Sequence, residues 1–348
     1  MRLLEKPIIQ GGMGVGISRS SLAGAVAKEG GMGVISAAQI GYDMPFFFQD
    51  PETANLQALS AEIKKAKQIS ENKGAIAVNL MTVTQLYSEY VKTAVEAGVD
   101  AIISGAGLPL KLPEYVKNSD VKIAPIVSSR KAAEVILKMW DKKYQRTADF
   151  IVMEGPSAGG HLGFSEETLE DLSLAEQGFA EEVKTTIQLK NQYEEKYKTH
   201  IPLFVAGGIS TREDVLRAFS LGADGVQVAS RFVATKECDA SAAYKQAYID
   251  AKEEDLMIIE SPVGMPGRAI RNPFVERMQR ESEKITFCYN CLKACNPAEA
   301  KYCISQALID AVKGDVENGL LFAGACVGQI HQIQTVKEVI DELLGEEK

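Results

Sequence analysis

The sequence predicts an α/β protein of the closed (β/α)8 TIM-barrel class, with a mainly helical extension at its C-terminal end. Short apolar runs alternate with longer amphipathic stretches, and eight such runs occur before residue 230. Continuous apolar runs bounded by glycine or polar residues are typical of strands that are buried on both faces. Eight strands, each followed by a helix or a long connection, favour a closed barrel over an open doubly wound sheet.

The predicted strands and helices follow one another along the chain. Strands are expected over residues 7–10, 33–36, 75–79, 100–104, 122–127, 149–154, 202–206 and 224–228. Helices are expected over 56–70, 88–98 and 211–221, the last with Ser210 as its cap and Gly222 at its end. Two strands end in Asn79 and Glu154, at the carboxyl edge where barrel enzymes keep their chemistry.

Three segments depart from this repeat. Residues 41–53 are an aromatic insertion, residues 163–200 are acidic with a helix from about 180 to 197, and residues 254–300 carry glycine, proline, arginine and cysteines. Helices are again expected over 298–312 and 335–344. We therefore predict a barrel over residues 1–253 and an extension over 254–348 that packs on the barrel. The phenylalanines 46–48 either pack beneath their insertion, which we favour, or line a substrate entrance.

Composition excludes several classes of protein. The chain has 348 residues, of which 46% are hydrophobic and 24% charged, so it has enough apolar material for a large core. A net charge of −9 without a basic block argues against binding to nucleic acid or to an anionic membrane. No apolar run approaches the ~18 residues of a membrane span. The first residues lack a long apolar run, and the cysteines form no framework across the fold, so a cytoplasmic location is expected.

Glycine-rich segments follow three of the predicted strands. Residues 10–14, QGGMG, let a flat ligand approach the backbone, and Met13 offers an apolar contact; an ordinary tight turn is the alternative. Gly207 and Gly208 follow the seventh strand, and Ser230 follows the eighth. Because barrels often bind phosphate between these two loops, we expect a phosphate site on their N–H and hydroxyl groups. A Gly-Gly pair that only turns the chain is the alternative.

One of the three histidines lies in a glycine-rich loop. His161 closes the segment EGPSAGGH after the sixth strand, where a base or hydrogen-bond donor would be useful. A solvated or structurally bonded imidazole is the alternative. Glu154, at the start of this segment, is expected to accept hydrogen bonds from ligand hydroxyls. His200 and His331 lie outside such loops and are expected to be structural.

Taken together, these segments resemble the nitronate monooxygenase family, formerly called 2-nitropropane dioxygenase, which includes enoyl-acyl-carrier-protein reductase II. The resemblance rests on PIIQGGMG, LAGAVAKEGGMGVIS, AVNLM, ISGAGLP, EGPSAGGHLG, PLFVAGGIS and GVQVASRF, in this order. It covers residues 5–235 closely and returns around SPVGMPGRAIRNPF and GDVENGLLFAGACVGQI. The family is FMN-dependent, so the resemblance implies an FMN cofactor.

The resemblance also assigns roles by position. Gly12 and Met13 would lie near the isoalloxazine ring, with Asn79 hydrogen-bonded to the flavin. Three further positions would lie near the ribityl chain (Glu154, Gly159 and Gly160), and four would hold the phosphate (Gly207, Gly208, Ala229 and Ser230). His161 matches the active-site histidine of the family. Ala229-Ser230 stands where the family usually has Gly-Thr, and the serine keeps the hydroxyl.

Four cysteines in the extension depart further from the family pattern. They follow the spacing C-x2-C-x3-C-x7-C, and the first three resemble cluster ligands in flavin and iron–sulfur reductases of the 2,4-dienoyl-CoA reductase type (Cys288, Cys291, Cys295 and Cys303). Such thiols suit an iron–sulfur cluster or zinc. Reduced structural thiols are the favoured alternative, so we assign no metal ligand from the sequence.

The resemblance leaves more than one function open. The first expectation is a nitronate monooxygenase that oxidises alkyl nitronates to carbonyl compounds and nitrite. The second is an NAD(P)H-dependent flavin reductase of an enoyl thioester, favoured by the segment GRAIRN at 267–272 and by the cysteines. The third is a non-catalytic flavin-binding protein. The substrate is a small molecule in either enzyme, and a homodimer is one expected arrangement, because a partner often shields flavin pockets in such barrels.

Overall fold

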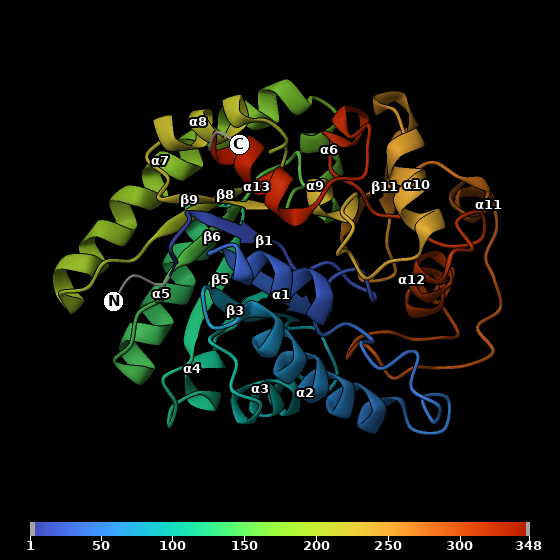
Figure 1. Cartoon of the computed structure of the whole chain (residues 1–348), viewed down its shortest axis with the longest axis horizontal. Coiled ribbons are helices and arrows are strands. Elements are labelled where there is room, and N and C mark those ends of the chain that lie inside the picture. The colour runs from blue at the N-terminus through green and yellow to red at the C-terminus, as the bar shows by residue number, and fades with distance from the viewer. Residues whose placement is uncertain (1–3, 346–348) are drawn as a thin grey trace.

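Eight parallel strands close into a barrel in the computed structural model, which describes residues 4–345 (Figure 1). Residues 1–3 and 346–348, the outer ends of the two predicted segments, lie outside the described residues. The strands are β1 (Ile8–Gln10), β2 (Met32–Ser36), β3 (Ala75–Met81), β4 (Ala101–Gly105), β5 (Lys122–Val127), β6 (Ile151–Glu154), β8 (Leu203–Ala206) and β9 (Gly225–Val228). Each neighbours the next in this order, and β9 pairs with β1. The predicted barrel is confirmed, with strand ends shifted by one or two residues.

Helices surround the barrel and also occur in the extension. Those along the barrel are α1 (Ser20–Lys28), α2 (Pro51–Ser70), α3 (Tyr87–Glu96), α4 (Leu112–Tyr115), α5 (Arg130–Tyr144), α6 (Glu166–Leu169), α7 (Leu172–Tyr197), α8 (Arg212–Ser220) and α9 (Ser230–Val233). They are followed by α10 (Ala242–Asp250), α11 (Pro273–Arg280), α12 (Ile304–Lys313) and α13 (Val336–Leu344). None of the described helices is long and apolar enough to cross a membrane.

Several helices begin at other residues than predicted, including α7 at Leu172 instead of about residue 180 and α12 at Ile304 instead of residue 298. Capping explains two of these differences. α2 begins at Pro51 because the Asp50 side chain accepts a hydrogen bond from the Thr53 N–H at 3.0 Å, and proline suits the first helical position. The expected cap Ser210 of α8 is wrong. Thr211 is the N-cap, and it forms a reciprocal capping box with Asp214.

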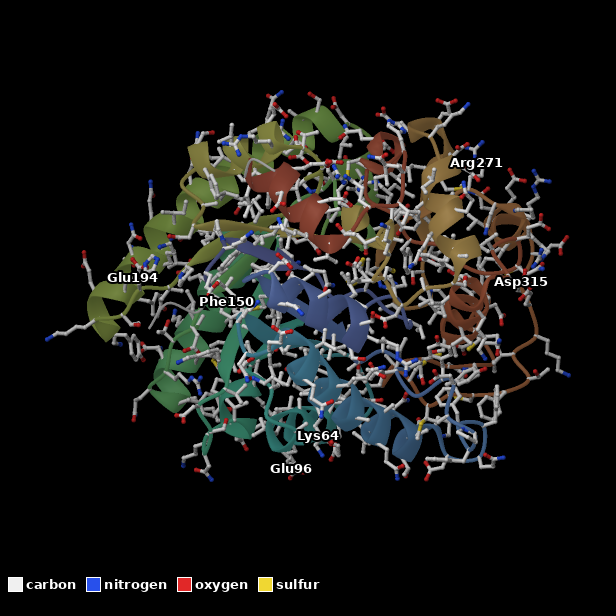
Figure 2. All side chains as sticks on the ribbon, viewed as in Figure 1. Lys64, Glu96, Phe150, Glu194, Arg271 and Asp315 are labelled. Carbon is white, nitrogen blue, oxygen red and sulfur yellow. The ribbon has the colours of Figure 1, made fainter. Side chains whose placement is uncertain are left out.

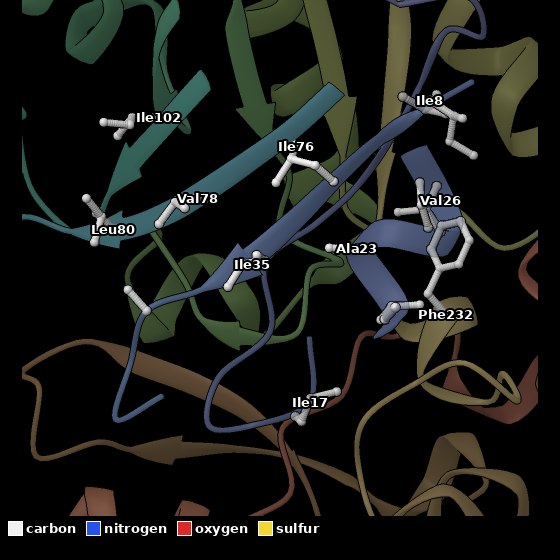
Figure 3. Close-up of a cluster of buried hydrophobic side chains, with 14 of the residues drawn as sticks. Ile8, Ile17, Ala23, Val26, Ile35, Ile76, Val78, Leu80, Ile102 and Phe232 are labelled. Atoms are coloured by element: carbon white, nitrogen blue, oxygen red, sulfur yellow. The ribbon is translucent and has the colours of Figure 1, made fainter. Parts of the chain in front are cut away.

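The strand residues alternate between two apolar layers. One layer fills the barrel interior, where the rings of Phe150 and Phe204 meet edge to face at 5.9 Å. The other lies between the strands and the surrounding helices, where Figure 3 shows Ile8, Ile35 and Ile76. In Figure 2, charged side chains such as those labelled at the helix surfaces point outward, whereas Phe150 lies among the strands.

After α10 the chain enters the extension and forms a hairpin that the sequence does not predict. β10 (Leu256–Glu260) pairs antiparallel with β11 (Pro266–Ile270). β11 in turn pairs with the two-residue strand β7 (Gly160–His161), opposing Gly267 to His161. Helices α10, α11 and α12 lie on one side of the barrel, at the right of Figure 1. The hairpin therefore joins the extension to the loop that carries the predicted histidine.

Candidate active site

A cavity of about 230 Å³ lies at the carboxyl ends of the barrel strands. Residues from seven of the eight barrel strands, or from the loops directly after them, contribute to its wall, including Gly11, Ser36, Asn79 and Gly105. Tyr248 of α10 supplies the remaining wall together with Leu308 and residues 322–324 of the extension. The cavity is thus built jointly by the barrel and the extension, at the rim where barrel enzymes bind their ligands.

Most of the predicted site residues border this one cavity. They come from the loops after β1, β6 and β9 and from β3 itself (Gly12, Met13, Asn79, Glu154, Gly159, Gly160, His161, Ala229 and Ser230). Gly12 packs so closely against β3 that a Cβ at this position would come within 2.5 Å of the Asn79 Cβ. A glycine is therefore required there for the first loop to approach the third strand.

Gly207 and Gly208 do not border the cavity but lie against the adjacent loop. Both have left-handed backbones, with φ of +98° and +70°, and a Cβ on Gly208 would come within 2.8 Å of the Ser157 Cβ. Their N–H groups make no hydrogen bond to any residue between 4 and 345. The buried Ser210 hydroxyl also has no partner there. This cluster of free donors is the chemistry that a phosphate group requires.

The N-terminus of α8 does not add donors to this cluster. The Asp214 carboxylate accepts hydrogen bonds from the N–H groups of Ser210 and Thr211, each at 2.9 Å. The expected contribution of this helix end to phosphate binding is therefore reduced. On the opposite side, the Ser230 hydroxyl accepts a hydrogen bond from the Gly324 N–H at 3.0 Å, which ties the loop after β9 to the extension.

Three side chains with an amide or a carboxyl group border the cavity without a hydrogen-bond partner among the described residues. They are the amides of Asn79 and Gln227 and the carboxyl group of Glu154. Burial raises the pKa of Glu154 to about 7, because no cation offsets the loss of water around the carboxylate. Amide and carboxyl groups left free in this way are suited to bind the polar edge and hydroxyl groups of a ligand.

His161 also borders the cavity, and burial lowers its pKa to about 4. The imidazole is therefore neutral near pH 7. Its Nε2 lies 2.7 Å from the Ser261 Oγ, and its ring meets the Phe322 ring edge to face at 4.9 Å. Ser261 follows β10, so the extension holds the histidine from two sides.

The hydrogen bonds of Ser261 determine which nitrogen of His161 carries the proton. The Ser261 Oγ accepts from the Val263 N–H at 3.3 Å, and its own proton finds an acceptor among the described residues only at His161 Nε2. A buried hydroxyl donates where an acceptor exists. We therefore assign the neutral tautomer with the proton on Nδ1, which leaves an N–H donor without a protein partner in residues 4–345.

The loop between β6 and β7 is fixed by a buried arginine. Arg268 in β11 is 5% exposed, and its guanidinium donates hydrogen bonds to the carbonyl groups of Pro156 and Ala158. Burial lowers the pKa of Arg268, and the Glu176 carboxylate offsets only part of this shift. This contact explains why the segment GRAIRN adjoins the site: it positions the glycine-rich loop.

A second, narrower cavity of about 50 Å³ continues from the first. His161, Thr84, Met81 and Leu308 border both cavities. Beyond them the second cavity is bordered largely by apolar side chains of the barrel and of the extension (Val15, Leu86, Val263, Leu292 and Ile304). His161 therefore lies at the junction of the two cavities.

Sequence reasoning missed several residues of the site. Tyr248 lies in α10, and the others belong to the extension (Ser261, Arg268 and Phe322); only the packing of these segments on the barrel brings them to the cavity. Gln227 lies in the motif GVQVASRF, one residue before the end of β9. Its position near the end of a strand was the signal that could have identified it as a site residue.

The other histidines and the aromatic insertion lie away from the cavities. His200 contacts Glu194 and Asp224 on the surface, and His331 is exposed. Phe47 is fully buried and stacks on Tyr289 at 5.5 Å, while neither it nor its two phenylalanine neighbours borders either cavity. The favoured expectation that these phenylalanines pack beneath the insertion agrees with the position of Phe47 but not with that of Phe48, which is 55% exposed.

The fold and the cavity define a (β/α)8-barrel protein with its site at the carboxyl ends of the strands. A family model described as nitronate monooxygenase matches residues 1–346. The chain belongs to the nitronate monooxygenase family, and it is an oxidoreductase of this generally flavin-dependent family.

Individual relatives are distant. A probable nitronate monooxygenase from Staphylococcus saprophyticus is 26% identical over 81% of this chain and 80% of its own. A (3aS,4S,5R,7aS)-5-hydroxy-7a-methyl-1-oxo-octahydro-1H-indene-4-carboxyl-CoA dehydrogenase from Mycobacterium tuberculosis is 23% identical over 98% of this chain and 92% of its own. The structure of FabK from Thermotoga maritima is 27% identical with a TM-score of 0.71, covering 99% of this chain and 93% of that one. A nitroalkane oxidase structure from Streptomyces ansochromogenes, 19% identical, shares the fold.

Proposed function

We propose that this protein is an FMN-dependent enzyme that oxidises alkyl nitronates to carbonyl compounds and nitrite. The observation that carries the proposal is the neutral His161 imidazole at the cavity, with its Nδ1–H free of protein partners in the described residues. A nitronate bears its negative charge on the nitro oxygens and has already lost its α-proton. It therefore needs a hydrogen-bond donor rather than a base.

Residues on opposite sides of the cavity fit FMN. The N–H groups of Gly207 and Gly208 are free donors for its phosphate, and Glu154 has a free carboxyl group for its ribityl hydroxyls. The Asn79 amide and the apolar Met13 side chain suit the flavin ring. When bound, FMN supplies the electron acceptor for the substrate. The protein residues bind and orient the two reactants and exclude water from between them.

Two variants of His161 test whether its imidazole acts as a hydrogen-bond donor or as a base. His161→Asn keeps an N–H donor on a short side chain, whereas His161→Ala removes it. We expect His161→Ala to lower kcat/KM for propan-2-nitronate about 10- to 100-fold, the usual range for a hydrogen bond to a charged group. His161→Asn should retain part of this activity. Equal loss in both variants, with FMN content unchanged, would contradict the donor role.

An anaerobic spectrum tests the reaction itself. Protein loaded with FMN is mixed separately with propan-2-nitronate, NADH and NADPH, and the flavin absorption is followed. We expect the nitronate to bleach the flavin, with nitrite produced once oxygen is admitted, and neither nicotinamide to do so. Bleaching by NADH or NADPH alone would favour a reductase. Absence of flavin bands after FMN is supplied would overturn the cofactor assignment.

The alternative is an NAD(P)H-dependent flavin reductase that acts on an enoyl thioester. The apolar second cavity beside His161 favours it, since an acyl chain needs more apolar surface than a small nitronate. The similarity to FabK and to a carboxyl-CoA dehydrogenase over nearly the whole chain points the same way. In that case the His161 N–H would donate to the thioester carbonyl. The use of NAD(P)H and the formation of a homodimer stay predictions.

A further inference from the structure

Four cysteines of the extension come together beside the second cavity. We call them the four-cysteine cluster (Cys288, Cys291, Cys295 and Cys303), and none is in a disulfide. The thiol of Cys303 interacts electrostatically with those of Cys288 and Cys295. The thiol of Cys291 interacts in the same way with Cys295 and Cys303. The fold thus gathers thiols that the sequence shows only as a spaced series.

The loop that carries this cluster is docked on the barrel next to the site. The Gln85 N–H donates to the Cys291 carbonyl at 3.1 Å, and the Lys293 N–H donates to the Val83 carbonyl at 3.0 Å. Thr84, between these two contacts, borders both cavities, and Cys291 itself borders the second cavity. The cluster therefore forms part of the wall that continues from His161.

Backbone amides are directed at the sulfur atoms. The Asn290 N–H donates to the Cys288 Sγ at 3.4 Å, in a turn where Asn290 has a φ of +49°. Cys303 is the N-cap residue of the ten-residue helix α12; burial raises the pKa of its thiol, and the amides of Ser305 and Gln306 offset part of this rise. Amide donors of this kind stabilise thiolates and the sulfur ligands of iron–sulfur clusters.

The absence of a site for a single metal ion in the described residues distinguishes between two kinds of metal centre. Within residues 4–345, no three His, Cys, Asp or Glu side chains are arranged to share one metal ion. A single zinc binds its thiolates at about 2.3 Å, so four ligands of zinc must crowd around one point. In a [4Fe–4S] cluster each thiolate binds a different iron, and the ligands can lie further apart.

We propose that the four-cysteine cluster binds a [4Fe–4S] cluster at the wall of the active-site cavities. Binding forms one iron–sulfur bond per cysteine, and each thiol releases one proton to solvent. The proposal includes no electron transfer. It stands independently of the substrate and of FMN, because none of the four residues is assigned to hold the flavin. Its structural effect is to fix the loop 288–295 against residues 83–85.

Metal analysis of the full chain tests this proposal. The protein is purified without oxygen, reconstituted with ferric iron and sulfide in the presence of a thiol reductant, which reduces part of the iron, and separated from excess reagents. We expect about four iron and about four acid-labile sulfide per chain, and an electron paramagnetic resonance signal after reduction with dithionite. One equivalent of zinc without labile sulfide, or no metal with all six thiols still titratable, would overturn the proposal.

Matched variants identify the ligands. Cys288→Ser/Cys295→Ser changes the less buried members of the cluster and should lose the iron and sulfide. Cys238→Ser changes a buried cysteine elsewhere, whose thiol contacts the Ile17 carbonyl, and should keep both. FMN content and circular dichroism measured on the same samples show whether each variant is folded. Retention of iron and sulfide in the double variant would contradict the assigned ligands.

Discussion

Within the cavity, burial shifts the pKa of two ionisable residues toward their neutral forms. The pKa of Glu154 rises to about 7, and that of His161 falls to about 4. Neither side chain has a charged partner among the described residues that would offset its desolvation. Charging either group in the folded protein therefore lowers the free energy of unfolding. For Glu154 this loss occurs as the pH rises toward about 7, and for His161 as the pH falls toward about 4.

Glu154→Gln should remove the loss of stability that charging of Glu154 causes. In the FMN-free protein, the native carboxyl group binds its proton more tightly than the unfolded one, whose pKa is about 4.5. The free energy of unfolding of the wild type should thus fall as the pH rises from about 4.5 to 7, by on the order of 3 kcal/mol from this group. The variant should lack this fall in urea unfolding measured across that range. Glu96→Gln, at an exposed residue, is the control and should follow the wild type.

Ser261→Ala tests the assigned tautomer of His161. Without the serine proton, Nε2 loses its donor, and the imidazole is free to carry its proton on either nitrogen. We expect kcat/KM for the nitronate to fall by up to about tenfold, the cost of about one hydrogen bond, with a changed pH profile. Ser261→Thr keeps the hydroxyl and should restore most of the activity. Unchanged kinetics in Ser261→Ala would show that the tautomer is set by another group.

The sequence located some of these residues and not others, for a physical reason. Glu154 and His161 stand at the end of a strand and in a glycine-rich loop, so local patterns placed them at the carboxyl edge of the barrel. Ser261 is 100 residues from His161 along the chain. Its contact depends on the pairing of β11 with β7, and no local pattern encodes such a long-range pairing.

Among the elements, the β10–β11 hairpin contributes most to the site outside the barrel. Its turn carries Ser261, its second strand pairs with β7, and Arg268 in that strand donates to carbonyls of the loop after β6. The hairpin therefore acts on the cavity through three separate contacts. Its apolar segment LMIIE was visible in the sequence, but the proline- and glycine-rich surroundings concealed it.

Arg268→Met measures what the hairpin contributes to cofactor binding. The substitution keeps an apolar chain of similar length but leaves the carbonyls of Pro156 and Ala158 without their donor. We expect the Kd of FMN, measured by fluorescence quenching, to rise at least tenfold while far-ultraviolet circular dichroism stays unchanged. Arg271→Met, at the exposed arginine labelled in Figure 2, should leave the Kd unchanged. Similar losses in both variants would contradict a specific role of Arg268.

The barrel strands were predicted more reliably than the ends of the helices and the structure of the extension. Each barrel strand is a short apolar run buried on both faces, which is a strong local signal. Helix starts depend on single capping residues, so the start of α2 and the cap of α8 were missed by one or more residues.

For the molecule as a whole, FMN should act as a stabilising ligand. A ligand that binds only the native state, at about 100 times its Kd, raises the free energy of unfolding by about 2.7 kcal/mol. We expect the Tm to rise with FMN concentration. Gly208→Val should reduce this rise, since Gly208 has a left-handed backbone and a side chain there would meet Ser157. Gly178→Val, at a helical glycine with open space around it, is the control and should keep the full rise. A Tm independent of FMN would contradict the proposed cofactor.

The closure of the barrel has a consequence for how the protein is made. β1 pairs with β9, joining Gln10 to Val228, and β7 pairs with β11, joining His161 to Gly267. At about 5–20 residues per second, the first strand waits roughly 10–40 s on the ribosome before its partner has been synthesised. The histidine is then fixed only after the hairpin emerges. A polypeptide released early, between residues 230 and 256, would contain every barrel strand and still lack β11, the strand that pairs with β7.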